Sequence, residues 1–374
     1  MMLPCSIRAL TGCAAALLTA GAAAAQETNA PLPRWSSALA QRPAAWYATP
    51  QALLIASNVI RYQSPEGGWP KNLNLAAAPS GPGDIPESTA ANANTIDNGA
   101  TTTPLRFLAR VVHATGHEPS RAAFNRGLDY LLAAQYPNGG WPQYYPLRRG
   151  YYSHITYNDG AMIHVLNLLR DAANGGPPFV FVDEERRARS AAAVARGVEC
   201  ILRTQVRQND HLTVWCAQHD ARTLAPAPAR NFEPASLSGA ESVGIVRFLM
   251  SLEPTTPAVR NAVEGAVAWF RESALSGIRV ETFTNAAGQR DRRVVEDPTA
   301  GPLWARFYEL GSHRPLFVGR DRVPHYRYDE IETERRVGYA YYTDAPAALL
   351  EKDYPRWRRK LAPAAPVARP EPQS

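Results

Sequence analysis

Cysteine is scarce in this sequence of 374 residues: of the four, only Cys200 and Cys216 lie beyond residue 25. One optional bridge in a chain of this length excludes a disulfide scaffold, so a large hydrophobic core must hold the fold. Beyond residue 25 no apolar run reaches the roughly 20 residues needed to span a bilayer, so we expect no membrane span. No linker-like composition interrupts residues 50–345. We expect a single main domain there and a monomeric protein.

Lysine is also rare, although the chain has 40 lysines and arginines together, a formal charge of +6 and a pI near 9.2. The positive charge therefore comes mainly from arginine, whose planar fork suits bidentate binding of carboxylates or phosphates. A polyanionic partner is one interpretation, and a basic but inert surface is the other. The chain has no recognisable nucleic-acid-binding motif, so we expect no nucleic acid partner.

The two ends of the sequence differ from its middle. Residues 1–25 carry a basic residue, an apolar stretch and small residues, the layout of a cleavable export signal, so we expect a secreted or periplasmic protein. Cys13 ends an LTGC motif that is similar to a lipoprotein box. The apolar segment follows that cysteine instead of preceding it, so we expect no lipid anchor. Residues 26–49 are predicted to be an N-terminal extension, and residues 346–374 a C-terminal tail, largely disordered from about 363.

Helical periodicity dominates the middle of the chain. Apolar residues recur at spacings of three and four in seven successive segments, which predicts seven helices. These segments are 50–63, 100–115, 120–135, 159–174, 185–205, 238–252 and 256–275.

An internal repeat underlies these helices. The segments QSPEGGWPKN from Gln63 and QYPNGGWPQY from Gln135 share Gln, Pro, Gly-Gly and Trp-Pro in register, and residues 205–215 keep the Gln and the Trp in a looser form. Each copy ends a helix pair, so the chain is predicted to stack helical hairpins. Trp69 and Trp141 are then either plugs between neighbouring hairpins or functional residues.

The fold class that this pattern predicts is all-α. We expect an incomplete α/α toroid built from helical hairpins over residues 50–345. Residues 279–342 contain a few β-leaning pieces on a long irregular path, which predicts a loop-rich C-terminal part with a few short strands. Loops of this length in a compact domain tend to be functional.

Two polar pairs stand directly in front of predicted helices. Asp97 and Asn98 precede one helix, and Asn158 and Asp159 precede another. Each pair could be an ordinary helix N-cap. If the helix ends of successive hairpins gather on one face, however, the four side chains form an oxygen-only set of the kind that Ca²⁺ prefers. The spacing alone leaves both interpretations open.

Arginines form a second candidate constellation. His219 and Arg230 lie in a proline-punctuated loop, and Arg306, Arg320 and Arg335 follow among tyrosines. Guanidinium groups can hold sugar carboxylates while aromatic faces contact sugar rings. A single exposed ion pair contributes under about 1 kcal/mol, so isolated surface pairs are the alternative interpretation.

A series of motifs, taken in order, resembles the pectate lyases of polysaccharide lyase family 10. The resemblance runs from about Ile55 to Tyr342, most of the chain. Its motifs are GGWPKN, TIDNGATT, YPNGGWPQYYP, ITYNDGAM, WCAQHD, ARNFEPASLSGAESVGIVRFLM, RFYEL, FVGRD and ERRVGYAYY. The resemblance implies an α/α toroid and Ca²⁺-assisted β-elimination that cleaves polygalacturonate, (1→4)-α-D-galacturonan, to 4,5-unsaturated oligogalacturonates.

The resemblance also assigns roles to residues. It implies Asp97, Asn98 and Asp159 as calcium ligands, and it implies Arg320 as the catalytic base. Its candidates for substrate binding are Lys71, Arg230, Arg306 and Arg335. Two positions depart from the family pattern: Gly160 stands where a second acidic residue is expected, and Arg322 where glycine is expected.

The chemistry explains why such residues are needed. The C5 proton of a uronate lies next to a carboxylate, so its removal places further negative charge on that group, and cations aimed there stabilise the transition state. Two alternatives remain open on a similar fold. One is an inverting glycoside hydrolase with Asp97 and Asp159 as its carboxylate pair. The other is a carbohydrate-binding protein.

Overall fold

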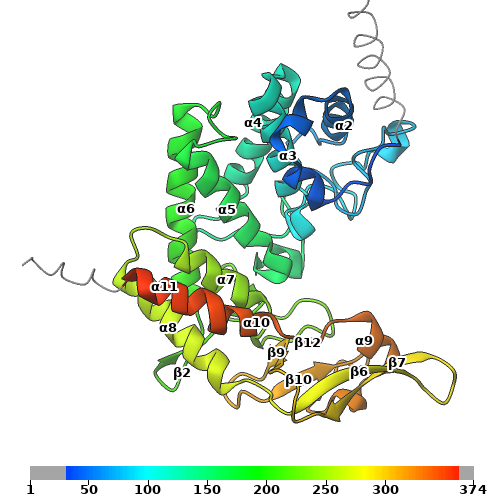
Figure 1. The fold of residues 1–374 in the computed structure, drawn as a ribbon, viewed down its shortest axis with the longest axis vertical. Helices are drawn as coiled ribbons and strands as arrows, with labels where there is room; N and C mark the ends of the chain where they lie inside the picture. The colour runs from blue at the N-terminus through cyan, green and yellow to red at the C-terminus, as the bar shows by residue number, and fades with distance from the viewer. Residues whose placement is uncertain (1–30, 362–374) are drawn as a thin grey trace, which may run out of the picture.

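The chain, seen in a computed structural model that describes residues 31–361, combines stacked helices with a strand-rich part (Figure 1). Threonine caps begin two of the helices, since Thr49 accepts a backbone N–H bond in front of Pro50 and Thr256 does so in front of Pro257. The α-helices are α2 (Pro50–Arg61), α3 (Thr102–Thr115), α4 (Glu118–Ala133), α5 (Ala161–Asn174), α6 (Glu184–Thr204), α7 (Glu241–Met250), α8 (Pro257–Glu272), α9 (Thr333–Gly338), α10 (Ala345–Ala348) and α11 (Tyr354–Leu361).

Consecutive helices pack in pairs, α3 with α4, α5 with α6, and α7 with α8. The pairs follow one another from the blue to the yellow part of the ribbon in Figure 1. Each helix buries an apolar stripe: on α5, Met162, Val165, Leu166 and Leu169 are fully buried. Burial of one such side chain contributes about 1.5–3 kcal/mol, so the paired stripes stabilise the stack.

Three glutamines connect neighbouring hairpins in the same way. The side-chain amide of Gln63 donates to the carbonyl oxygens of Gly67, in its own turn, and of Ala123, in α4, both at 2.9 Å. Gln135 and Gln205 repeat the arrangement, each with one carbonyl of its own turn and one of a later helix. The predicted repeat is therefore confirmed, including its looser third copy.

The repeat tryptophans plug the turns between hairpins. Trp69, Trp141 and Trp215 are fully buried, and each indole N–H donates at 2.8 Å to a carbonyl of the preceding helix. Trp304 makes the same 2.8 Å bond to Phe270 at the end of α8. Trp304 is thus a fourth copy of the repeat tryptophan. The sequence pattern missed it because the β-hairpin of residues 278–296 lies between Trp304 and α8.

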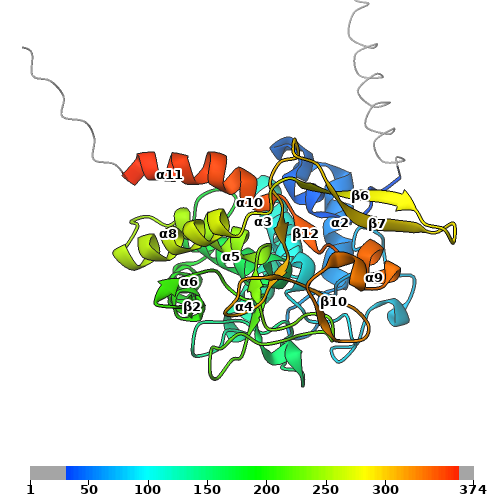
Figure 2. The ribbon, with the colours of Figure 1, turned by 90° about the horizontal axis from the view of Figure 1, so that it is seen from below.

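Short strands form most of the part that follows α8. The long hairpin pairs β6 (Ile278–Thr284) with β7 (Arg290–Glu296) and projects from the molecule on the side opposite α11 (Figure 2). The other strands are β1 (Ile155–Thr156), β2 (Arg207–Gln208), β3 (His211–Leu212), β4 (Gln218–His219), β5 (Leu237–Ser238), β8 (Trp304–Ala305), β9 (Phe307–Tyr308), β10 (Pro315–Val318), β11 (Pro324–His325) and β12 (Tyr342–Thr343). The largest sheet has the order β11-β10-β9-β5.

The predicted fold class is wrong. Helices make up about 46% of the structure and strands about 12%, so the protein is not all-α. Within residues 31–361, nothing shows the hairpins arranged as an α/α toroid. The repeat residues determine contacts between neighbouring hairpins, whereas the curvature of a whole stack depends on small rotations per repeat that no sequence pattern carries. Beyond residue 277, β-branched and aromatic residues favour strands.

Both ends of the described chain pack onto the helices. The short helices η1 (Ser37–Gln41) and η2 (Ala44–Ala48) bury Leu39 and Tyr47 in the core. At the other end α10, the π-helix η8 (Leu349–Asp353) and α11 bury Leu349 and Trp357. Among the helices of residues 31–361, none combines the length and the hydrophobicity that a membrane span requires.

Some predictions concern residues that the structure does not describe. The expected export signal at 1–25 and the expected disordered tail from 363 lie outside the described residues. The proposed domain boundaries stay a prediction. Cys200 and Cys216 are both buried and are not joined to each other.

Candidate active site

Two short turns bring together the polar pairs that precede α3 and α5. These turns, η4 (Asp97–Gly99) and η6 (Asn158–Gly160), lie against each other. Asn98 has φ 50° and ψ 26°, and Asp159 has φ 50° and ψ 27°, so the same left-handed turn occurs twice. Neither turn, and neither following helix, has a side-chain N-cap bond. The N-cap interpretation is therefore wrong. Non-glycine residues held at positive φ cluster at functional sites.

Asp97 is buried and paired with a lysine. Its side chain is 7% exposed, and Lys71 Nζ lies 2.5 Å from Asp97 Oδ2. Burial is the largest single effect on the pKa of Lys71 and lowers it, but the hydrogen bond and charge of Asp97 together with Tyr144 raise it further, so the net shift is upward. The ammonium group also lies 5.8 Å from the centre of the Tyr144 ring. Lys71 thus adds a fixed positive charge at the first turn.

Asp159 is more exposed and faces an arginine. Arg306 Nη2 lies 3.3 Å from both Asp159 Oδ1 and Asn158 Oδ1, and it also contacts a carboxylate oxygen of Glu241. The side chain of Glu241 is 3% exposed, and that of Arg306 is 12% exposed. Burial lowers the pKa of Arg306, but the charges of Glu241, Tyr339 and Asp159 raise it further than burial lowers it.

Sequence reasoning missed Glu241. A signal for it existed, because Glu241 begins α7 just as the pairs at Asp97 and Asp159 precede α3 and α5. The third helix of the series thus also carries a carboxylate to this face. Its partner Arg306 follows β8, so the strand-rich part supplies the cation.

Three arginines surround the ring of Phe232, another residue that sequence reasoning missed. The guanidinium carbons of Arg335, Arg230 and Arg320 lie 4.6, 4.8 and 5.8 Å from its centre. Cations over an aromatic face are attracted by about 0.5–2 kcal/mol each. Phe232 therefore gathers arginines from three separate segments of the chain.

Tyr339 joins this cluster to Arg306. Its ring lies 5.0 Å from the Arg306 guanidinium carbon and 5.7 Å from that of Arg230. Its hydroxyl donates to Glu233 at 2.8 Å, and Glu233 also pairs with Arg230. Burial raises the pKa of Tyr339, so the hydroxyl stays protonated. The arginines, the two rings and Asp159 form one continuous series.

Arg320 lies at the exposed end of the series. Its side chain is 59% exposed and makes two bonds of 3.1 Å to Glu334, which also binds Arg335. Arg335, and then Arg320, lower the pKa of Glu334 to about 2. Arg320 lines a groove of about 550 Å³ with Tyr151, Ala229, Arg230, Asn231, Phe232, Gly319 and Arg322.

The two departures from the family pattern have a structural context. Gly160 has φ 70°, and a Cβ there would lie 3.3 Å from the His164 ring, so an acidic residue at this position would be strained. Arg322 has φ 65°, a conformation that favours glycine. Arg322 lines the same groove as Arg320, so it adds a cation where glycine would add none.

His219 supports the second turn without lining the groove. The imidazole is fully buried; Nε2 accepts the Cys216 N–H at 3.1 Å, and Nδ1 bonds the Leu224 carbonyl at 2.9 Å. Burial lowers the pKa of His219 to about 4. The loop it braces presents the Ala217 carbonyl, which accepts from the N–H groups of Tyr157 and Asn158 at 2.8 and 3.0 Å.

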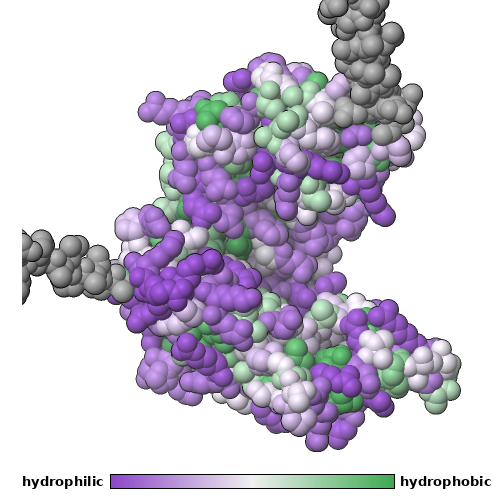
Figure 3. Space-filling view, in the orientation of Figure 1, coloured by the Kyte–Doolittle hydropathy of each residue, from purple (hydrophilic) through white to green (hydrophobic). Residues whose placement is uncertain are grey.

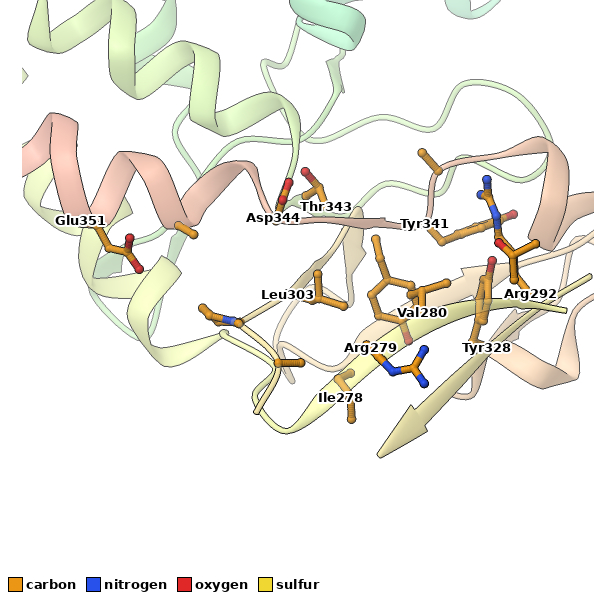
Figure 4. Close-up of a pocket in the computed structure, with 17 residues that line it drawn as sticks. Ile278, Arg279, Val280, Arg292, Leu303, Tyr328, Tyr341, Thr343, Asp344 and Glu351 are labelled. Atoms are coloured by element: carbon orange, nitrogen blue, oxygen red, sulfur yellow. The ribbon is translucent and has the colours of Figure 1, made fainter. Parts of the chain in front are cut away.

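A larger cavity lies away from these residues. It has a volume of about 690 Å³ and lies between the β6–β7 hairpin and the chain around Tyr342 (Figure 4). None of the predicted site residues lines it. The candidate active site is therefore the groove lined by Arg230, Arg320 and Arg322, which we call the arginine groove. The residues in and beside this groove come from the loops of the helical part and from the strand-rich part. Figure 3 shows that the surface is hollowed between the helical part and the strand-rich part.

The site offers the type of oxygen ligand that calcium prefers, but it offers fewer ligands than calcium needs. Carboxylate and amide oxygens are the ligands that Ca²⁺ prefers, and it takes six to eight of them. Asp97 and Asp159 are each engaged by a protein cation. Within residues 31–361, no group of three or more His, Cys, Asp or Glu side chains could hold a metal ion.

Comparison with known proteins gives the class. A family model described as pectic acid lyase matches residues 63–350. A family 10 polysaccharide lyase from Cellvibrio cellulosa has a solved structure with a TM-score of 0.70 and 35% identity, covering 84% of this chain and 95% of its own. Another solved structure, an Asp-to-Ala mutant from the same organism in complex with trigalacturonic acid, has a TM-score of 0.70 and 34% identity, covering 88% of this chain and 100% of its own. No curated protein matches.

The family model and the similarity in fold and sequence to these two structures thus define a polysaccharide lyase. More particularly, the chain belongs to the pectic acid lyase family, and pectate lyase activity is the function that this membership supports.

Proposed function

We propose that this chain cleaves polygalacturonate by β-elimination in the arginine groove. The observation that carries the proposal is the unbroken series of arginines and rings, from Arg320 over Phe232 and Tyr339 to Arg306 beside Asp159. The Cellvibrio cellulosa lyase in complex with trigalacturonic acid supports the substrate class. A uronate chain carries one carboxylate per sugar, which matches a row of guanidinium forks.

Arg230, Arg306, Arg335 and Lys71 are proposed to hold substrate carboxylates. Glu233, Glu241, Glu334 and Asp97 hold these four cations in place before substrate arrives. Because Arg230 and Arg335 are already oriented by Glu233 and Glu334, these two cations need little reorganisation when negative charge develops on the sugar carboxylate. Phe232 and Tyr339 offer apolar faces for the sugar rings beside them.

Arg320 is proposed to remove the C5 proton. The C5 proton passes to the neutral guanidine form of Arg320, the C4–oxygen bond breaks as the 4,5-double bond forms, and the departing oxygen takes up a proton from solvent to become a hydroxyl, so no water attacks a carbon atom. Arg320 first has to turn from Glu334 toward the groove. Glu334 is shared with Arg335, so the carboxylate keeps a cationic partner when Arg320 moves.

Asp97, Asn98 and Asp159 are the residues proposed to hold calcium, and its further oxygen ligands would have to come from outside the protein. When bound, the ion would supply positive charge to the carboxylate next to the reacting C5. Lys71 and Arg306 lie on these aspartates, so they are the groups that would have to shift toward the substrate. Export by a signal at residues 1–25 and a monomeric state are proposed on sequence grounds alone.

The test is a product assay on polygalacturonate, with Ca²⁺ or with EDTA. Elimination gives a 4,5-unsaturated end that absorbs in the ultraviolet, whereas hydrolysis gives new reducing ends without that absorbance. Asp159→Ala is expected to abolish activity and leave the helical circular dichroism unchanged. Asp159→Asn is the sharper variant, because asparagine tolerates the left-handed turn and removes only the charge.

Glu185→Ala, at an 80% exposed side chain on α6, is the matched control and should be fully active. Reducing ends without ultraviolet absorbance would show hydrolysis and refute the lyase proposal. Full activity of Asp159→Ala in EDTA would refute the calcium proposal.

A further inference from the structure

Basic side chains gather at the far end of the described chain. Four of the five residues 356–360 are basic: Arg356, Arg358, Arg359 and Lys360. All four are exposed on α11, over which Figure 3 shows a hydrophilic surface. This accumulation lies away from the arginine groove, so catalysis does not account for it.

A second groove, of about 530 Å³, lies between α11 and the end of α7. Its lining residues are Arg247, Met250, Ser251, Asp353, Arg356, Trp357 and Lys360. Asp353 pairs with both Arg247 and Arg356 at 2.8 Å, and none of the ion pairs within residues 31–361 involves Lys360. The groove therefore has three cations and one anion along its wall.

Like the arginine groove, this second groove combines an aromatic residue with basic side chains. Trp357 is 5% exposed, and its buried Nε1 has no hydrogen-bond acceptor among residues 31–361. At the rim, Arg170 Nη1 bonds Ser251 Oγ at 2.5 Å, which brings a third guanidinium, and a fourth cation, beside the groove. Cations around an aromatic residue again form the wall of a concave site.

Helix α7 runs from the Arg306 end of the arginine series to the second groove. It begins at Glu241, beside Arg306, and ends at Met250, in the second groove. Ten residues of α-helix span about 14 Å, so one ligand sugar cannot touch both sites. A long polymer chain can bind at both.

We propose that this second groove binds a stretch of polyuronate and keeps the enzyme on its polymer between cleavages, an inference that rests on the proposed function for the identity of the polymer. Repeated carboxylates match the excess of cations along the wall. An anionic membrane is the weaker match, because membrane binding calls for exposed apolar anchors. The exposed large apolar residues among 31–361 are Leu54, Leu147, Val180, Leu310, Val323 and Tyr326, and none lies on α11. A second contact raises the effective concentration of polymer at the catalytic groove.

The experiment reverses two charges in the groove, Arg356→Glu with Lys360→Glu, in the full chain. Affinity electrophoresis measures retention in gels containing polygalacturonate, and steady-state kinetics measures cleavage of trigalacturonate. The control, Arg260→Glu with Arg290→Glu, changes the net charge equally at exposed sites elsewhere. We expect the groove variant to bind the polymer about fivefold to tenfold more weakly at low salt, with less difference at high salt, and to cleave the trimer as the wild type does.

Equal retention of the groove variant and the wild type would overturn the inference. So would an equal loss in the control variant, which would show an effect of net charge alone. Groove-dependent binding to phosphatidylglycerol vesicles without loss of polymer retention would assign the groove to lipid and also overturn it. If no variant, nor the wild type, gives unsaturated product yet retention still depends on the groove, the inference stands and the proposed function fails.

Discussion

The buried ion pair between Arg306 and Glu241 allows a quantitative prediction. Among residues 31–361, Arg306→Ala leaves the Glu241 carboxylate, 3% exposed, with the Ser238 hydroxyl as its one remaining hydrogen-bond donor. Removing one partner of a buried pair costs about 3–5 kcal/mol, because the remaining charge is desolvated without compensation. The unfolding entropy of a chain of this size is about 0.7 kcal/mol/K, so Tm should fall by about 4–7 °C.

Differential scanning calorimetry of four proteins measures this effect. Arg306→Ala should show the full loss. Arg306→Met combined with Glu241→Gln removes both charges and should recover most of the stability, because a neutral pair needs no counter-charge. The double variant should nevertheless stay inactive, since Arg306 is proposed to hold a substrate carboxylate. Arg189→Ala, which breaks an exposed pair with Asp129, should cost less than about 1 kcal/mol. An Arg306→Ala protein with the wild-type Tm would refute the reasoning.

The remaining predictions concern the base, acid stability and the brace of the second turn. Arg320→Lys should lower kcat by about 100-fold or more with KM little changed. Wild-type activity should rise toward alkaline pH, because a guanidinium must lose its proton to act as base. A near-normal kcat of Arg320→Lys would show that Arg320 is not the base. Bonding by Arg336 lowers the pKa of Asp291 to about 2, so its stabilisation, roughly 2 kcal/mol, is present above about pH 4 and lost as pH falls to 2. Urea unfolding should therefore show Asp291→Asn less stable than wild type at pH 6 and nearly equal at pH 2, and equal stability at both would contradict the assignment. His219→Leu leaves two buried main-chain groups unpaired and should lower both Tm and kcat; an unchanged kcat would show that the turn at Asp159 does not depend on this brace.

The sequence by itself determined the local units and the family. Apolar periodicity predicted the paired helices, and the Gln and Trp positions predicted the turns between them, because both depend on residues close in sequence. The motifs also named Asp97, Asp159, Arg230, Arg306, Arg320 and Arg335. Their types indicated an acidic ligand, since few side chains can hold carboxylates in a row.

Only the tertiary structure decided the fold class and the contacts between the residues of the site. The strand-rich part depends on how distant segments pair, which no local pattern specifies. Glu241 and Phe232 were identified as site residues from their contacts with Arg306 and Arg320, which lie 65 and 88 positions away in the sequence (306 minus 241, and 320 minus 232). Contacts of that sequence separation form because burial of the shared core brings the helix ends and the strands to one surface, and that burial is a property of the whole chain.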